Sequence, residues 1–103
     1  MNENTHYDLI FKELKTKVYK HANLKFRLED NGSAVVVSYI PRIELFYMNS
    51  RATLIFLAID GRRNLEDMLD YFNKKYTRHK MLDDIVRTIR YLEARGAIEL
   101  VNN

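Results

Sequence analysis

The sequence has no cysteine, and it has only three glycines and one proline among 103 residues. Without cysteine the chain cannot form disulfides, thiolate nucleophiles, zinc–thiolate sites or iron–sulfur clusters. Hydrophobic residues make up 47% of the sequence, so low-complexity disorder is not expected. A chain of this length forms one folded domain, because it is too short for two domains with separate cores.

Long hydrophobic runs are also missing. The longest nearly apolar stretch, Leu54 to Ile59, is far shorter than a membrane span. The first residues show no basic segment leading into an apolar stretch, which a secretory signal would require. We therefore expect a cytoplasmic protein that makes no contact with a membrane.

Signatures of catalysis are absent as well. The sequence has no glycine-rich phosphate loop and no nucleophile motif. His6, His21 and His79 are far apart and lack the spacing of metal ligands. The pair Asp83-Asp84 fits the first turn of a helix better than it fits an acid/base pair. The sequence predicts a protein that is not an enzyme and that holds neither a metal ion nor a cofactor.

The net charge is mildly basic, +3 with an isoelectric point near 9.2. Such a charge suits an acidic partner, either nucleic acid or an acidic peptide. Charges of both signs alternate along the chain, so the charge alone does not choose between these partners.

Apolar residues at helical spacing predict an amphipathic helix from Asn4 to about His21. The apolar positions of this segment are Tyr7, Ile10, Phe11, Leu14 and Val18. We treat residues 1–22 as an N-terminal helix that precedes the main domain, residues 23–103.

Three strands follow in the sequence pattern. Residues 25–29 alternate between polar and apolar side chains, and the turn pair Asn31-Gly32 links them to the β-branched and aromatic segment 34–40. Pro41 ends that strand, and residues 43–48 read as a third. The pattern predicts a three-stranded antiparallel meander.

Three helices complete the predicted domain. Asn49 or Ser50 caps the first, which stops at Asp60-Gly61, and Asn64 caps the second. The second carries an apolar stripe formed by Leu65, Met68, Leu69, Phe72 and Tyr76. The third runs from Leu82 or Asp83 to Arg95, with Leu82, Ile85, Ile89 and Leu92 in the core and Gly96 at its end; residues 98–101 form an extended tail. The fold class is α+β, in the order α-βββ-ααα.

The third predicted strand is apolar on both faces. Only one face can contact the helices that follow, so something must cover the other. The N-terminal helix is the first candidate, and a second copy of the chain or another protein is the alternative. The same strand ends the meander, so its free edge can accept an added strand from a peptide.

A flank of the third helix offers the second wall of a peptide cleft. Val86, Arg90, Ala94 and Ala97 lie along this flank, with Arg87 at its margin. Arg87 and Arg90 can bind carboxylates, although solvated surface arginines explain the same pattern. The predicted peptide-binding residues are Ile43, Glu44, Leu45, Phe46, Tyr47 and Met48 on the strand, with Val86, Arg87, Arg90 and Ala94 on the helix.

From Val35 to Leu100 the chain resembles the PqqD family, also called RiPP precursor recognition elements. Several segments carry the resemblance in order and spacing. They are Tyr39-Ile40-Pro41, Met48-Asn49, Ala52 through Ile59 with Asp60-Gly61, Leu65 through Tyr76, Leu82 through Val86, and Leu92 through Ile98. The N-terminal helix lies outside this motif.

The resemblance implies a winged-helix-like fold and a non-catalytic peptide chaperone. In that family the leader segment of a ribosomally synthesised precursor adds as a strand beside the third strand, against the third helix. A maturation enzyme, often a radical S-adenosylmethionine (radical SAM) enzyme, then acts on the bound precursor. The resemblance therefore implies two partners, a precursor leader peptide and a maturase, within natural product biosynthesis.

Two other classes remain open. A winged-helix DNA-binding transcriptional regulator would also show three helices, a hairpin and a basic charge. However, the third helix mixes Asp83, Asp84 and Glu93 with its arginines and offers no polar amide for reading bases. A structural subunit of a larger complex is the third class.

Overall fold

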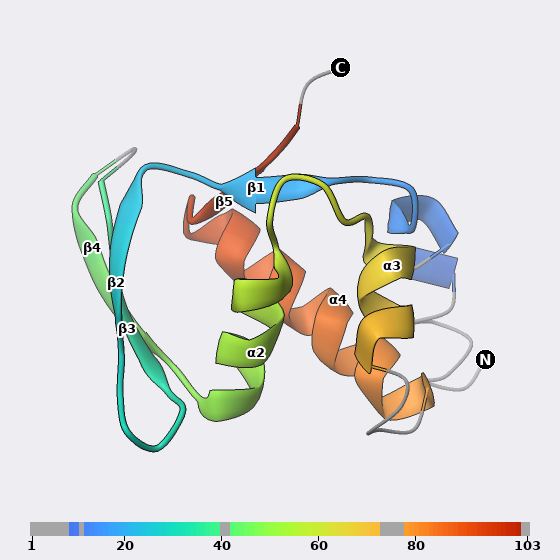
Figure 1. Cartoon of the computed structure of the whole chain (residues 1–103). Helices are drawn as coiled ribbons and strands as arrows, with labels where there is room; N and C mark the ends of the chain where they lie inside the picture. Colours follow the sequence, from blue (N-terminus) through green and yellow to red (C-terminus); the bar gives the residue numbers. More distant parts are fainter. Residues whose placement is uncertain (1–8, 11, 40–41, 73–77, 102–103) are drawn as a thin grey trace.

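A computed structural model describes residues 9–10, 12–39, 42–72 and 78–101. Figure 1 shows a sheet at one side of the molecule and helices beside it. The elements are β1 (Tyr19–His21), β2 (Leu24–Leu28), β3 (Ala34–Ser38), β4 (Glu44–Met48), α2 (Ser50–Ala58), α3 (Leu65–Phe72), α4 (Arg78–Ala94) and β5 (Ile98–Leu100). The α+β class and the three-stranded meander followed by helices are confirmed.

The main sheet has the order β2-β3-β4, and both strand pairs are antiparallel. Phe26, Val36 and Phe46 lie opposite one another in register. Val36 and Phe46 are buried, so this row faces the helices. Because side chains alternate along a strand, the neighbouring rows face away from the core.

Local signals in the sequence set the ends of the helices. The side chain of Asn49 accepts a hydrogen bond from the backbone N–H of Ala52 at 2.8 Å and so caps α2. Asn64 and Asp67 each accept a bond from the other's backbone N–H, which begins α3 with a reciprocal cap. Gly96 follows α4 with a φ of 72°, a left-handed conformation that favours glycine.

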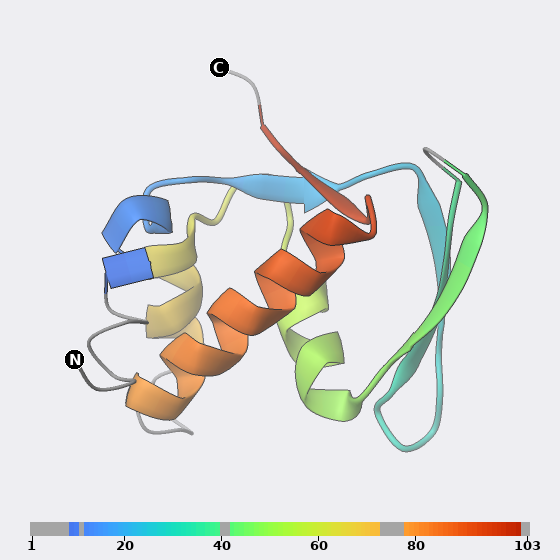
Figure 2. The ribbon, with the colours of Figure 1, turned by 180° about the vertical axis from the view of Figure 1, so that it is seen from behind.

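The core lies between the inner face of the sheet and the three helices. Figure 2 shows α4 running across the back of the molecule beside α2 and α3. The predicted core residues of α3 and α4 are fully buried: Leu65, Met68, Leu69, Leu82, Ile85, Ile89 and Leu92, and Phe72 nearly so. Tyr76, predicted to continue the stripe of α3, lies outside the described residues, as do Ile40 and Pro41.

The prediction of one helix as far as His21 is wrong. Among the described residues, 9–10 and 12–14 are helical, and a turn follows in which the N–H of Lys17 donates to the carbonyl of Leu14. Tyr19–His21 forms β1, which pairs antiparallel with β5, Tyr19 opposite Leu100. Backbone pairing with a distant segment therefore replaces the helix, and the predicted extended tail is the partner strand.

The described residues of the N-terminal helical segment, 9–10 and 12–14, do not cover the main sheet, which corrects a second expectation. Ile10 and Leu14 pack against the core, and the carbonyl of Lys15 accepts a bond from the N–H of Glu66 in α3. In Figures 1 and 2 this segment lies beside α3, at the end of the molecule opposite to β2–β4. Within the described ranges, no helix is both long and apolar enough to cross a membrane.

Candidate functional site

The outer edge of β4 is open as far as the described residues show. β4 is the last strand of the sheet, and in the described part of the chain no further strand pairs with it. A strand edge of this kind presents backbone N–H and C=O groups that can pair with an extended segment. The predicted strand Ile43 to Met48 thus lies at a sheet edge as expected, with Ile43 just before the first paired residue.

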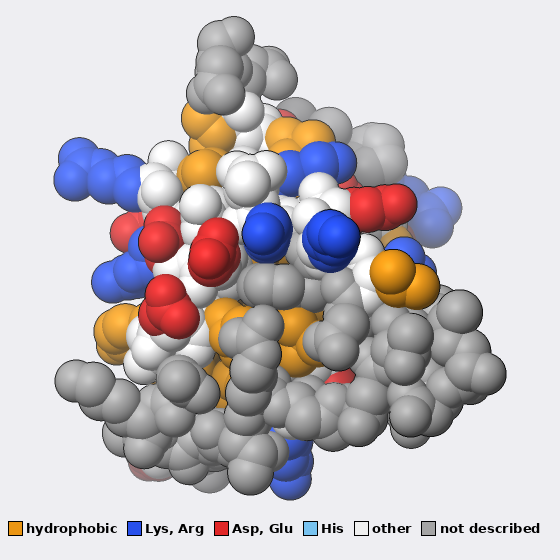
Figure 3. Space-filling model, turned by 90° about the vertical axis from the view of Figure 1, so that its right-hand side faces the viewer, with side chains coloured by type: hydrophobic (Ala, Val, Ile, Leu, Met, Phe, Trp, Pro, Cys, Tyr) orange, Lys and Arg blue, Asp and Glu red, His pale blue; other side chains and the backbone are white. Residues whose placement is uncertain are grey.

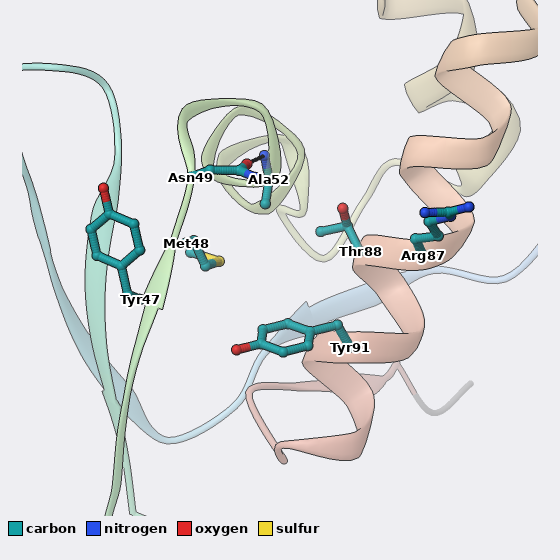
Figure 4. A pocket seen from close by; sticks show the side chains of 7 residues that line it. All are labelled: Tyr47, Met48, Asn49, Ala52, Arg87, Thr88 and Tyr91. Atoms are coloured by element: carbon teal, nitrogen blue, oxygen red, sulfur yellow. Dashed lines mark hydrogen bonds between the residues drawn. The ribbon is translucent and has the colours of Figure 1, made fainter.

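A pocket of about 250 Å³ lies beside this edge, between β4, the start of α2 and α4 (Figure 4). Its lining residues are Tyr47, Met48, Asn49, Ala52, Arg87, Thr88 and Tyr91. Met48 is buried, while Tyr47 and Tyr91 are 57% and 38% exposed. The pocket therefore combines apolar and aromatic walls with polar groups contributed by Asn49, Arg87 and Thr88.

The local structure explains why these residues meet. Asn49 directly follows β4 and caps α2, so Ala52 lies in the first turn of the helix, close to the strand end. Arg87 and Tyr91 are four residues apart on α4, which places them on the same face of that helix. A smaller hollow of about 220 Å³ shares Asn49, Ala52, Arg87 and Thr88 with the pocket and adds Arg51 and Asp84.

Ion pairs balance the charges around the pocket. Nη1 of Arg51 lies 2.7 Å from Oδ2 of Asp84, and Nε of Arg87 lies 2.8 Å from Oδ1 of Asp83. Figure 3 shows that acidic and basic side chains also share one surface at the α3 end of the molecule, away from the pocket. An acidic ligand in the pocket would therefore compete with carboxylates of the protein itself.

At the other end of β4, Arg95 connects the strand to α4. Its guanidinium carbon lies 4.8 Å from the ring centroid of Tyr91 and 5.3 Å from that of Phe46. Nη1 is also 3.8 Å from a carboxylate oxygen of Glu44, and the rings of Phe46 and Tyr91 meet edge to face. This cluster closes one end of the space between β4 and α4.

Two predicted wall residues are corrected. Val86 is 1% exposed and belongs to the core, and Ala97 is fully buried beyond the end of α4. Both side chains are buried in the core, so neither can line a surface cleft. Arg90 and Ala94 are exposed but are not among the residues that line the pocket.

The predicted strand residues divide by face. Phe46 and Met48 are buried, Glu44 is half-buried, and Ile43, Leu45 and Tyr47 are exposed. The structure thus brings Tyr47, Met48 and Arg87 together at the pocket. Sequence reasoning missed Asn49, Ala52, Thr88 and Tyr91; the four-residue step from Arg87 to Tyr91 was the signal that could have identified the last.

His21 has a structural position. Its ring stacks on Phe56 with 4.0 Å between centroids, and Nε2 lies 2.8 Å from the carbonyl oxygen of Phe56. Among the described residues, no three histidine, aspartate or glutamate side chains gather as a metal ion would require. The side chains of His6 and His79 lie outside the description.

The chain was compared with known proteins at three levels. No protein-family model, no curated protein and no solved structure matches it. The resemblance to the PqqD family therefore stays a prediction from the sequence.

Proposed function

We propose that this chain binds the leader segment of a ribosomally synthesised precursor peptide, as a strand added to β4, and presents the precursor to a maturation enzyme. The chain itself catalyses no reaction in this proposal. The carrying observation is the pocket that adjoins the open edge of β4. The substrate class comes from the sequence resemblance.

The edge and the pocket serve two separate needs of peptide recognition. Main-chain hydrogen bonds along β4 would hold any extended segment, whereas a pocket beside the edge selects a side chain. At about 250 Å³ the pocket is smaller than the usual range for drug-sized ligands. It suits one large apolar side chain of a peptide better than a cofactor.

The ion pairs argue that this apolar anchor contributes more to affinity than charge does. Arg51 and Arg87 already contact Asp84 and Asp83. A leader carboxylate that binds either arginine exchanges one carboxylate for another, so its net gain is small. Burying an apolar side chain against Met48 and Tyr91 has no such competitor.

The maturation enzyme is the second partner in this proposal. In the family that the sequence resembles it is often a radical SAM enzyme, and both proteins act in the cytoplasm, where the precursor is made. Delivery requires that the leader stay bound here while the remainder of the precursor reaches the enzyme.

The test is calorimetric titration with the leader peptide of a precursor encoded beside this chain. Tyr91→Ala removes one wall of the pocket and should weaken binding at least about tenfold, roughly 1.4 kcal/mol. Tyr71→Ala is the matched control, because Tyr71 is also exposed and has Arg63 at 4.8 Å from its ring, yet it lies on α3. This control should bind the leader like the wild type.

A second arm tests the backbone contacts. In an added strand only every second N–H faces β4. A leader N-methylated at the residues of that set loses all its N–H donors to β4 and should lose binding, whereas a leader N-methylated at the other alternate residues keeps these donors and should bind. The proposal would be contradicted if both N-methylated peptides bound as tightly as the unmodified leader and the Tyr91→Ala variant bound the leader as tightly as the wild type. Steeply salt-dependent binding of duplex DNA, with no binding of the peptide, would favour the regulator alternative instead.

A further inference from the structure

The outer face of the sheet carries an exposed apolar surface that shares one residue, Tyr47, with the pocket. Two cross-strand rows form it: Lys25, Val37 and Leu45, and Arg27, Val35 and Tyr47. Leu45 is 70% exposed and Tyr47 is 57% exposed. A shallow hollow of about 330 Å³ lies on this face, lined by Lys25, Phe26, Arg27, Val35, Val37 and Leu45.

Nothing in the described part of the chain covers this face. The three helices lie against the opposite side of the sheet, and the N-terminal helical segment lies beside α3 (Figures 1 and 2). A contiguous apolar surface with polar residues at its margin is characteristic of a protein interface.

The charges of this face are at one margin only. Lys25 and Arg27 lie on β2, whereas the β4 margin holds Leu45 and Tyr47. Arg27 is held by Glu29, with Nε at 3.1 Å and Nη2 at 2.9 Å from Oε1. Its charge is therefore offset locally, and within the described residues Lys25 makes no ion pair.

We propose that a second copy of this chain packs on the outer face, related by a two-fold axis parallel to the strands. This axis places β2 of each copy over β4 of the other. Each Arg27 then meets the ring of the partner's Tyr47, and each Lys25 stem lies over the partner's Leu45. A guanidinium against an aromatic ring is a favourable pairing, and tyrosine and arginine are enriched in interfaces.

The charge pattern selects this axis over the other face-to-face arrangement. A two-fold axis across the strands would place β2 over β2, so Lys25 of one copy would face Arg27 of the next, and like charges repel. With the axis along the strands, Val35 and Val37 of the two copies meet at the centre, and no like charges come into contact.

The dimer leaves the proposed peptide site accessible. The pocket lies between β4 and α4, on the helix side of the sheet, whereas the dimer uses the opposite side. Tyr47 is the one residue that the two surfaces share, and Leu45, whose variant tests the dimer, does not line the pocket, so either proposal can fail alone.

Sedimentation equilibrium up to about 1 mM tests the proposal. The wild-type chain should show a monomer–dimer equilibrium, and Leu45→Glu should raise the dissociation constant at least about tenfold. Leu57→Glu is the matched control: Leu57 is an exposed leucine on α2, and its variant should dimerise like the wild type. Circular dichroism of each variant verifies the fold.

A charge exchange tests the axis. Arg27→Glu alone should weaken the dimer, because it loses the contact with the partner's Tyr47. Combining it with Tyr47→Arg should restore dimerisation, since each new glutamate then faces an arginine of the other copy. If the double variant does not dimerise, the proposed axis is wrong. A wild-type chain that stays monomeric, even if it binds an acidic peptide or anionic vesicles through this face, overturns the dimer.

Discussion

The guanidinium of Arg95 lies over the ring of Tyr91, with 4.8 Å between its central carbon and the ring centroid. Because the same group lies over Phe46 and near Glu44, one side chain ties the end of α4 to β4. This contact holds the strand and the helix that form the two sides of the pocket in a fixed relation.

Replacing Arg95 by alanine should lower the free energy of unfolding by about 1 kcal/mol, because it removes two cation–aromatic contacts and one ion pair. Arg95→Lys keeps the charge but loses the planar group that stacks on both rings. We expect lysine to recover less than half of the loss in urea unfolding. A lysine variant as stable as the wild type would show that charge alone matters at this position.

Asn49 should be important for stability as well as for the pocket. Its side chain accepts the bond that begins α2, and loss of such a cap costs about 1 kcal/mol. Asn49→Ala should show this loss in urea unfolding. Asn49→Asp keeps the acceptor and adds a negative charge at the positive end of the helix, so its stability should equal or exceed that of the wild type.

Ser38 should be replaceable without loss of stability. It is fully buried, and its Oγ has no hydrogen-bond partner among the described residues. An unsatisfied buried hydroxyl is destabilising, so Ser38→Ala should be neutral or more stable by up to about 1 kcal/mol.

Thr53 is the contrasting case. Its buried hydroxyl donates to the carbonyl oxygen of Asn49 at 2.8 Å. Thr53→Val keeps the shape and removes the donor, and it should cost about 1 kcal/mol. If both variants lost the same stability in thermal unfolding, our account of Ser38 would be wrong.

Tyr19 should make stability fall at alkaline pH. Burial raises the pKa of Tyr19 above its ordinary value of 10.0, and the negative charge of Glu93 acts in the same direction. The unfolded chain therefore loses this proton at a lower pH than the folded chain. Stability from this group is complete below pH 10.0 and falls as pH rises toward the pKa of the folded state.

Tyr19→Phe removes the titrating hydroxyl. The variant should therefore lose less stability than the wild type when urea unfolding is followed upward from about pH 9. An equally steep decline in both proteins would assign the alkaline loss to other groups.

The parts of the fold that local sequence determines were predictable. Asn49 begins α2 and Gly96 ends α4 through contacts within a few residues, and the place of residues 43–48 as the last strand of the meander located them at the sheet edge. β1 was not predictable, because its partner β5 lies far along the chain. Up to Val18 the apolar spacing fits a helix equally well.

The site was predictable only in part for a related reason. Helical periodicity shows which residues of α4 share a face. It does not show which of these faces lies toward β4, because that depends on how the strand and the helix pack. Val86 and Thr88 flank Arg87 in sequence, yet Val86 is in the core and Thr88 lines the pocket. Only the structure showed which side of α4 lines the pocket.

The pairing of β1 with β5 means that the N-terminal segment is not detachable. Tyr19 contributes a buried ring to the core, and its strand is the neighbour of Ile98–Leu100. A chain shortened to begin at residue 23 would lack the Tyr19 ring in the core and would leave β5 without its partner strand. Such a chain would be expected to borrow the missing strand from another molecule, or to aggregate.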